Sequence, residues 1–291
     1  MPLKNNLTQH YINLLKRSLV GQLYIENEYH ITRAIASLVY GKVTYQDFYA
    51  IDRTDFMFQG LKEQKENGNT FVFRKPGSGT PIFELRNLTE LAHTMIGMKR
   101  MDNIQYCVET VLKENVAGDL IETGVWRGGA AIFMRGLLAA YGINDRVVWV
   151  ADSFQGVPPP THPQDANLDL SAKVYPFLTV SRKEVEGLFE RYGLLDDKVE
   201  FLEGWFKDTL ASAPIETLSI LRLDGDLYES TMDALNPLYA KVTTGGFIIV
   251  DDYYSCPPCK CAVDDFRATK GISDEMFKID DQSVFWKKCE T

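Results

Sequence analysis

Acidic residues at the ends of short apolar runs are the side chains in this sequence best placed to do chemistry. Each run, DLIETG, VVWVADS, VEFLEG, LSILRLDGD or GGFIIVDD, has the length and apolar content of a buried strand. The acids that close these runs are Glu122, Asp152, Glu203, Asp224, Asp251 and Asp252. Any one of them could simply cap a following helix, because carboxylates favour the positive helix N-terminus. Five apolar runs that all end in acid indicate a shared functional site.

The last two runs supply carboxylates suited to a metal ion. Asp224-Gly-Asp226-Leu-Tyr-Glu229 follows the fourth run, and Asp251-Asp252 ends the fifth. Carboxylates from neighbouring strand ends repel each other unless a cation neutralises them. An all-oxygen donor set favours Mg²⁺, with manganese or calcium as substitutes. The alternative for Asp226 and Glu229 is that they cap the helix that follows.

A divalent ion at this position would activate a hydroxyl group for attack on an electrophile. Coordination lowers the pKa of a bound oxygen acid and orients it toward the reacting carbon. Asp224 is the candidate for both metal ligand and proton acceptor, because a carboxylate beside the hydroxyl can take its proton as the new bond forms.

The first run leads into a turn that suits S-adenosylmethionine. In Glu122-Thr-Gly-Val-Trp-Arg-Gly-Gly129 the spacing is not G-x-G-x-x-G, and an acid precedes Gly124, where the lack of a side chain lets a ligand approach the backbone. An acid here repels a pyrophosphate but accepts from an ammonium group. S-adenosylmethionine carries an ammonium and a sulfonium and no phosphate.

The second and third runs could hold the nucleoside half of the same cofactor. Asp152 is in the position from which a carboxylate takes both hydroxyls of a ribose. Gly204, Trp205 and Phe206 follow the third run and could frame an adenine ring. Core packing is an equally good explanation for the two aromatic residues.

Helical stretches between the runs predict how these acids come together. Apolar periodicity places helices at about residues 130–141, 181–192 and 230–239. Strands that alternate with helices predict an α/β fold with a parallel sheet covered on both faces. In such sheets ligands bind beyond the carboxyl ends of the strands, where the acids lie.

The first 110 residues or so are predicted to be helical and irregular. Apolar residues near helical spacing, from Tyr11 through Leu14, Leu15 and Leu19 to Leu23, predict a helix that packs on the core or on a partner subunit. A glycine- and proline-rich stretch at 64–80 predicts a mobile loop over a site. A further helix is expected at about 103–114.

Composition excludes several classes of protein. The chain of 291 residues is 45% hydrophobic and carries a net charge of -9, which argues against nucleic-acid binding. No apolar run approaches the roughly 18 to 20 residues of a membrane span, so we expect a cytoplasmic protein with no membrane partner.

The five cysteines, an odd number, do not suggest a disulfide framework. Three of them, Cys256, Cys259 and Cys261, stand together in CPPCKC. A zinc site would need a further ligand, and no histidine is near in the sequence. We therefore interpret CPPCKC as a loop with free thiols, with zinc as the alternative.

Taken together, these runs resemble those of a known enzyme family. LIETGVWRGGA, VWVADSFQGVP, LEGWFKDTL, LRLDGDLYEST and GGFIIVDDY, preceded by HTMIGMKRMDNIQYCVETVL, are similar to the macrocin and mycinamicin O-methyltransferase family, the TylF type. The similarity covers about residues 90–286. It implies a Rossmann-like class I methyltransferase sheet with an N-terminal, mainly helical extension at 1–90, which serves oligomerisation and covers the substrate, and a methyltransferase domain at 91–291.

The resemblance also implies an activity and a set of site residues. The activity is Mg²⁺-dependent transfer of a methyl group from S-adenosylmethionine to a hydroxyl of a small-molecule natural product. The acceptor is a deoxysugar of a macrolide-like or other glycosylated secondary metabolite, and the enzyme is a homodimer or homotetramer. The implied metal ligands are Asp224, Asp251 and Asp252, with Asp224 as base and also in contact with the cofactor. The implied cofactor residues are Thr94, Met95, Ile96, Glu122, Gly124, Trp126, Asp152, Ser153, Gly204 and Trp205.

Other functions remain as alternatives at this point. A nicotinamide-dependent oxidoreductase on a similar sheet should show a phosphate-binding glycine loop and a Tyr-x-x-x-Lys pair, and neither occurs where expected. A non-catalytic cofactor-binding scaffold would not need every acid of the site. Methylation of a polyketide or phenolic hydroxyl shares the same metal chemistry.

Overall fold

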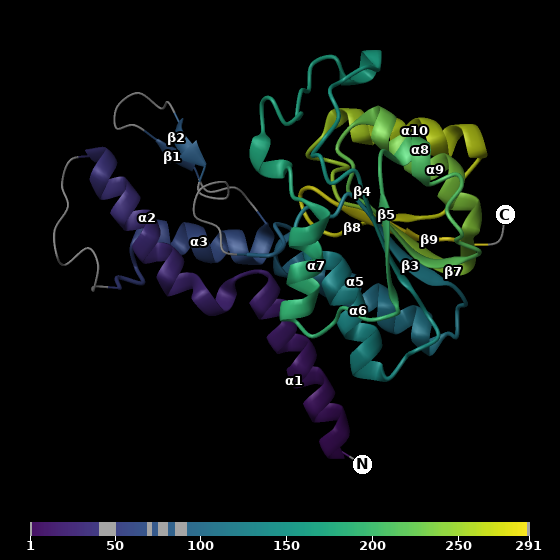
Figure 1. The fold of residues 1–291 in the computed structure, drawn as a ribbon, viewed down its shortest axis with the longest axis horizontal. Coiled ribbons are helices and arrows are strands. Elements are labelled where there is room, and N and C mark those ends of the chain that lie inside the picture. The colour runs from purple at the N-terminus through teal and green to yellow at the C-terminus, as the bar shows by residue number, and fades with distance from the viewer. Residues whose placement is uncertain (1, 41–50, 69–71, 75–80, 85–91, 290–291) are drawn as a thin grey trace. The chain divides into compact units, whose positions relative to one another are not determined.

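The computed structural model describes residues 2–40, 51–68, 72–74, 81–84 and 92–289 of the chain. These residues form two compact units. The larger unit comprises Met1–Ile12 with Arg100–Thr291, and the smaller comprises Asn13–Lys99. Figure 1 shows the elements of both units in order along the chain.

The smaller unit is mainly helical. It contains the part of α1 (Pro2–Leu19) that follows Ile12, α2 (Ile25–Tyr40), α3 (Phe56–Asn67) and the antiparallel strands β1 (Val72–Arg74) and β2 (Pro81–Glu84). Tyr29, Phe58 and Leu61 form the centre of its core. Asp55 accepts a hydrogen bond from the Met57 amide and so caps α3.

Two predictions for the N-terminal region need correction. α1 (Pro2–Leu19) is a helix as expected, but Leu23 lies in a separate 3₁₀ turn, and Leu14 is exposed while Leu15 and Leu19 are buried. The predicted loop at 64–80 begins inside α3 and includes β1. Residues 69–71 and 75–80 of that loop lie outside the described part of the chain.

A seven-stranded sheet organises the larger unit. Its strands are β3 (Asp119–Thr123), β4 (Val148–Asp152), β5 (Val199–Glu203), β6 (Leu218–Leu223), β7 (Val242–Val250), β8 (Met276–Lys278) and β9 (Val284–Lys287). The order across the sheet is β5-β4-β3-β6-β7-β9-β8. The first five strands run parallel, as predicted, and β9 and β8 add an antiparallel edge that the sequence analysis did not anticipate.

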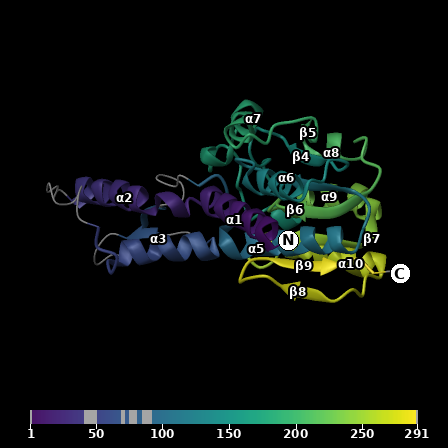
Figure 2. The same ribbon diagram turned by 90° about the horizontal axis from the view of Figure 1, so that it is seen from below.

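Helices cover both faces of this sheet, as expected for the Rossmann-like arrangement. Figures 1 and 2 show α5 (Gly97–Lys113), α6 (Gly129–Tyr141) and α7 (Arg182–Arg191) on one face. α8 (Phe206–Thr209), α9 (Tyr228–Leu238) and α10 (Pro257–Lys270) cover the other. On that second face Leu221, Leu235 and Phe266 belong to one apolar core, which anchors the strands from which the site residues project.

Strand register brings the acids to one edge. β3 and β6 are neighbours at the point where the strand order reverses, with Thr123 beside Leu223. Leu223 in turn lies beside Val250 of β7. Asp224 and Asp251 therefore follow paired residues, and open sheets of this kind bind ligands where the strand order reverses.

The CPPCKC segment is not the predicted loop. Cys256 immediately precedes α10, and Cys259 and Cys261 lie inside that helix. Pro257 and Pro258 occupy the first positions of the helix, where proline is favoured because its missing N–H has no helical partner. All five cysteines are free thiols, and Cys107 and Cys259 are buried.

Among the described residues, no helix has the length and apolar character that crossing a bilayer would require.

Candidate active site

A buried arginine on β6 organises the acidic edge of the sheet. Arg222 lies beside Glu122 in the register of β3 and β6, so both side chains project from the same face. Asp224, two residues further along the chain, points to that face as well. Arg222 Nη1 lies 2.6 Å from Glu122 Oε1 and 2.7 Å from Asp224 Oδ2, and its Nη2 donates to Asp251 Oδ1. One guanidinium thus binds carboxylates from β3 and from the ends of β6 and β7.

A second buried arginine comes from α5. Arg100 Nη1 lies 2.5 Å from Asp251 Oδ2, and Arg100 Nε lies 2.7 Å from Asp280 Oδ2. Asp280 also accepts from the amides of Gln282 and Ser283, which fixes it in the turn before β9. Both oxygens of Asp251 are therefore held by arginines, one from β6 and one from α5.

The carboxylates outnumber these arginines. Two arginines, Arg100 and Arg222, face five acids: Glu122, Asp224, Asp251, Asp252 and Asp280. If all five acids are ionised, the formal charge of the group is -3. Burial, Asp226 and Asp224 raise the pKa of Asp252 well above its usual range. Burial and Asp251 raise the pKa of Asp224. The edge therefore favours a proton or a cation as an additional partner.

Asp252 offers a free ligand atom for such a cation. Its side chain is buried, and Oδ2 has no hydrogen-bond partner among the described residues, whereas Oδ1 accepts from Ser255 Oγ at 3.2 Å. Oxygen atoms of Asp224, Asp251 and Asp252 lie within 4.8 Å of one another. These residues fit a hard divalent ion, which takes carboxylate oxygens and water as ligands.

The predicted cofactor residues surround the ends of β3 and β4. Glu122 is buried, Oε2 has no hydrogen-bond partner among the described residues, and burial raises the pKa of Glu122 to about 8. Asp152 accepts from the amides of Val125 at 2.8 Å and Phe154 at 2.7 Å. Asp152 thus holds the loop after β3 in place, in addition to any contact with a ribose.

Gly124 has a structural role that the sequence analysis did not anticipate. Its φ is +87°, and a Cβ atom there would lie 1.8 Å from the backbone oxygen of Asp224. The amide of Asp224 donates to Thr123 O at 2.9 Å, so the ends of β3 and β6 are hydrogen-bonded side by side. Glycine is required at this position because β6 passes against it, whether or not a ligand is bound.

The remaining predicted cofactor residues lie at neighbouring strand ends or in the other unit. Trp126 donates through Nε1 to Phe177 O at 3.1 Å, and Ser153 donates to Gly156 O at 2.9 Å. Gly204 donates to Asp152 O at 2.9 Å, and Trp205, half-buried, precedes α8. Thr94, Met95 and Ile96 belong to the smaller unit, and their place over the cofactor stays a prediction.

Non-glycine residues with left-handed backbone gather at these strand ends. Trp126, Phe154 and Asp226 have φ values of 47°, 55° and 57°. Among the described residues, the only other non-glycine residue with this conformation is Asn115, which is remote from the strand ends of the site. Such backbone is unfavourable for residues with a side chain and is concentrated at binding and active sites. Its position supports the assignment of this edge as the functional site.

Glu203 lies apart from the other acids, and the helix that follows β6 is capped from another segment of the chain. Glu203 is exposed and lies 3.4 Å from Arg182, away from the buried acids. The sequence left open whether Asp226 and Glu229 cap the following helix. Leu227 occupies the N-cap position of α9 and makes no side-chain cap hydrogen bond, and Glu229 lies in the first turn of that helix. Asp165, from a distant 3₁₀ turn, accepts from the amides of Tyr228 and Glu229 at 2.7 and 3.1 Å.

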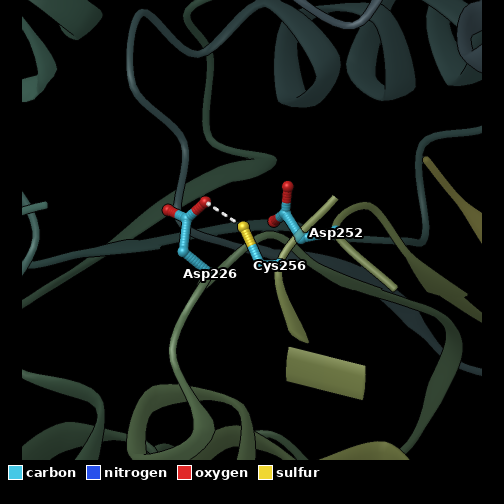
Figure 3. A group of neighbouring side chains, drawn as sticks. All are labelled: Asp226, Asp252 and Cys256. Carbon is cyan, nitrogen blue, oxygen red and sulfur yellow. Dashed lines mark hydrogen bonds between the residues drawn. The ribbon is translucent and has the colours of Figure 1, made fainter. Parts of the chain in front are cut away.

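Cys256 lies beside the acidic edge, as Figure 3 shows. Its thiol donates to Asp226 Oδ1 across 3.6 Å. Ligand atoms of Asp226, Asp252 and Cys256 lie within 4.8 Å of one another. Burial, Asp252 and Asp226 raise the pKa of this thiol.

Arg100, Arg222 and Asp280 are the residues that sequence reasoning missed. Arg222 had a signal, because a charged residue inside the apolar run LSILRL must find a partner if the run is buried. Arg100 and Asp280 had none, since each meets the site only through a contact between distant segments.

Comparison with known proteins finds a matching family and similar enzymes. Residues 8–288 match the family described as Macrocin-O-methyltransferase (TylF). The chain is 56% identical over 200 residues to demethyldecarbamoylnovobiocin O-methyltransferase of Streptomyces niveus, an alignment that covers 68% of this chain and 76% of that protein. It is 52% identical over 221 residues to 8-demethyl-8-(2,3-dimethoxy-alpha-L-rhamnosyl)-tetracenomycin-C 4'-O-methyltransferase of Streptomyces olivaceus, covering 75% of this chain and 84% of that one.

A solved structure shows the same fold. The structure of the O-methyltransferase NovP superposes with a TM-score of 0.76 at 43% identity, covering 97% of this chain and 100% of that chain. The sheet and the helices on both of its faces therefore follow the class I methyltransferase arrangement, and a helical region precedes them in the chain.

Proposed function

The chain belongs to the macrocin-O-methyltransferase (TylF) family and is an S-adenosylmethionine-dependent O-methyltransferase, and we propose that it methylates a deoxysugar hydroxyl of a glycosylated natural product with the help of Mg²⁺. The observation that carries the metal part of this proposal is the excess of buried carboxylates over arginines, with Asp252 Oδ2 left without a partner among the described residues. The sugar acceptor is supported by the relative that acts on a rhamnosyl-tetracenomycin.

Asp224 is the proposed proton acceptor. Its side chain is 26% exposed, unlike Asp251 at 6%, so an acceptor hydroxyl can reach it. Arg222 Nη1, 2.7 Å away, fixes the orientation of the Asp224 carboxylate. Burial and Asp251 raise the pKa of Asp224, which makes it a better base toward a hydroxyl than an ordinary carboxylate.

The proposed metal ligands are Asp224, Asp251 and Asp252. Mg²⁺, when bound there, would supply positive charge that lowers the pKa of the acceptor hydroxyl. Asp251 is held on both oxygens by Arg100 and Arg222, so we propose that Asp252, with its unpartnered Oδ2, is the stronger ligand of the adjacent pair.

Glu122 and Asp152 are the proposed anchors of the cofactor. S-adenosylmethionine, when bound, supplies the methyl group as an electrophile on its sulfonium. Glu122 Oε2 is a buried acceptor with no hydrogen-bond partner among the described residues, which suits the ammonium group of the methionine moiety. Asp152, at the end of β4, suits the ribose.

A methyl-transfer assay tests this proposal. Purified protein is given S-adenosylmethionine and matched panels of deoxysugar-bearing and phenolic acceptors, with Mg²⁺ or with EDTA, and methylated product is measured by mass spectrometry. We expect transfer to the sugar panel that EDTA abolishes and added Mg²⁺ restores. Asp224→Asn should lower kcat by about 10²- to 10⁴-fold, while isothermal titration still shows cofactor binding.

Glu186→Gln is the matched control, because Glu186 is also a carboxylate paired with an arginine, 2.8 Å from Arg182, but lies on α7 away from the site. It should keep full activity. Transfer that EDTA does not affect would contradict the requirement for Mg²⁺. Transfer to phenols alone, or no transfer to any deoxysugar-bearing acceptor, would contradict the proposed sugar acceptor.

A further inference from the structure

We propose that Asp226, Asp252 and Cys256 form a second divalent-cation site, which selects zinc-class ions over magnesium through its sulfur ligand.

Three separate elements bring these ligands together. Asp226 precedes α9, Asp252 follows β7, and Cys256 immediately precedes α10. One carboxylate oxygen from each aspartate and the sulfur of Cys256 all lie within 4.8 Å of one another. Figure 3 shows the three side chains converging, with the thiol directed at Asp226. The three ligand atoms are therefore close enough together to hold one metal ion.

The unpartnered oxygen of Asp252, on which the Mg²⁺ proposal also draws, adds to the geometry of this cluster. Asp252 is 8% exposed, and its Oδ2 atom has no hydrogen-bond partner among the described residues. A buried carboxylate oxygen is normally satisfied by a donor or a cation, because leaving it unpaired is unfavourable. The Asp252 side chain belongs to the Asp226–Cys256 group as well as to the acidic edge.

The sulfur decides which ions fit. Magnesium takes oxygen ligands and keeps much of its water, so a thiol adds nothing to its binding. Zinc and cobalt accept thiolate together with carboxylates in four-coordinate sites. Two carboxylates and one thiolate would leave a fourth position for water, as in zinc sites with three protein ligands.

Binding replaces one proton by one metal ion. The S–H bond of Cys256 breaks, the proton leaves to solvent, and the thiolate forms a bond to the divalent ion beside the two carboxylates. No electron is transferred in this step. Because Asp252 is shared, an ion held by Cys256 also reduces the negative charge available at the Asp224–Asp251 side.

Cobalt titration tests the site through its spectrum, independently of methyl transfer. Full-length protein is stripped with EDTA, desalted and titrated with Co²⁺ in the near ultraviolet. We expect a thiolate-to-cobalt charge-transfer band that saturates at about one ion per chain. Cys256→Ser should abolish the band, and Asp226→Asn should weaken Co²⁺ binding by about tenfold or more.

Cys261→Ser is the matched control, because Cys261 is another partly buried thiol of the same segment and belongs to neither metal-binding group. It should keep the band. Absence of the band in the native protein, or a band that survives in Cys256→Ser, would overturn the proposal.

Thiol protection gives a second test that needs no variant. The native protein is alkylated with iodoacetamide, and modification is mapped by mass spectrometry. Zn²⁺ at about ten times its dissociation constant should slow modification of Cys256 by about tenfold, and Mg²⁺ at the same concentration should not. Cys289, which is exposed, should react at the same rate throughout. Equal rates at Cys256 with and without Zn²⁺ would overturn the proposal.

Discussion

At the scale of single residues, two buried arginines are what allow so many acids to share one edge of the sheet. Arg222 is 1% exposed and contacts three carboxylates, and Arg100 is 3% exposed and contacts two. Together they hold Asp251 between β6 and α5. The arginines position the carboxylates, and the excess of acid over arginine leaves negative charge for a cation.

Replacing Arg222 should therefore destabilise the fold itself. Arg222→Met leaves Glu122, Asp224 and Asp251 without their shared cation, and removing one partner of a buried ion pair costs about 3–5 kcal/mol. Urea denaturation of the metal-free protein measures this loss in the free energy of unfolding. Arg182→Met is the control, because Arg182 is 43% exposed and its pairs should contribute about 1 kcal/mol or less. Equal losses in the two variants would show that Arg222 does not organise the site.

Glu122 predicts a pH dependence of stability. Burial raises its pKa in the folded protein to about 8, from an ordinary value of 4.5 when unfolded. Between these values the folded state binds the extra proton, so this residue's contribution to stability is complete below 4.5 and falls as pH rises toward 8. Glutamine has no proton to lose. Relative to the native protein, Glu122→Gln should therefore become progressively more stable from about pH 5 to about pH 8.5.

Urea denaturation across this range, without metal or cofactor, measures the Glu122 effect. Glu186→Gln, at a half-exposed position on α7, should show no comparable trend. A difference between Glu122→Gln and the native protein that stays constant with pH, or that moves the other way, would mean that Arg222 outweighs burial at Glu122.

At the scale of elements, the contact between the ends of β3 and β6 sets the position of Asp224. Gly124 lies against the Asp224 carbonyl, and the Asp224 amide donates to Thr123. A second contact of this kind lies at the start of α9, where Asp165 from a remote turn accepts hydrogen bonds from the first two amides of the helix. Both contacts tie the residues after β6 to other parts of the larger unit.

A pair of glycine variants separates this contact from simple backbone preference. Gly124→Ala would place a Cβ 1.8 Å from Asp224 O at a φ of +87°. It should cost about 3 kcal/mol or more and disable methyl transfer, because β6 must move. Gly142→Ala has a similar φ of +71° but nothing within 4 Å, so it should cost about 1 kcal/mol and leave transfer intact. Thermal melting and the transfer assay measure both, and similar costs for the two variants would contradict the close approach.

At the scale of the whole molecule, the net charge of -9 is not spread evenly. A group of buried acids lies at the carboxyl edge of the sheet. The partners of these acids are two arginines and, as we propose, a divalent cation. The protein should therefore respond to Mg²⁺ itself and not only to ionic strength.

Magnesium should raise the melting temperature. An ion at about 100 times its dissociation constant stabilises a folded protein by about 2.7 kcal/mol, which corresponds to about 5–10 °C for a domain of this size. Calorimetry with MgCl₂, against NaCl of matched ionic strength, measures the shift. Asp252→Asn should lose most of it, and Glu186→Gln should keep it. An equal shift with NaCl would indicate screening of charge and no specific site.

The sequence by itself determined the five parallel strands, the helices α6, α7 and α9 between them, and the acids at the ends of those strands. The alternation of apolar runs with helical periodicity is local, and so is the position of Asp224, Asp251 and Asp252 at the ends of their runs. Parallel strands place their carboxyl ends at one edge, so the meeting of these acids followed from pattern alone. The similarity of the motifs to a methyltransferase family followed in the same way.

Only the tertiary structure decided how the charges are balanced. Arg100 and Asp280 reach Asp251 across long stretches of sequence, and Asp165 caps a helix from another segment, so no local pattern marks them. CPPCKC begins a helix instead of a loop, which brings Cys256 to Asp226 and Asp252. Secondary structure is dictated by neighbours along the chain, but the partner of a buried charge is dictated by what folds against it.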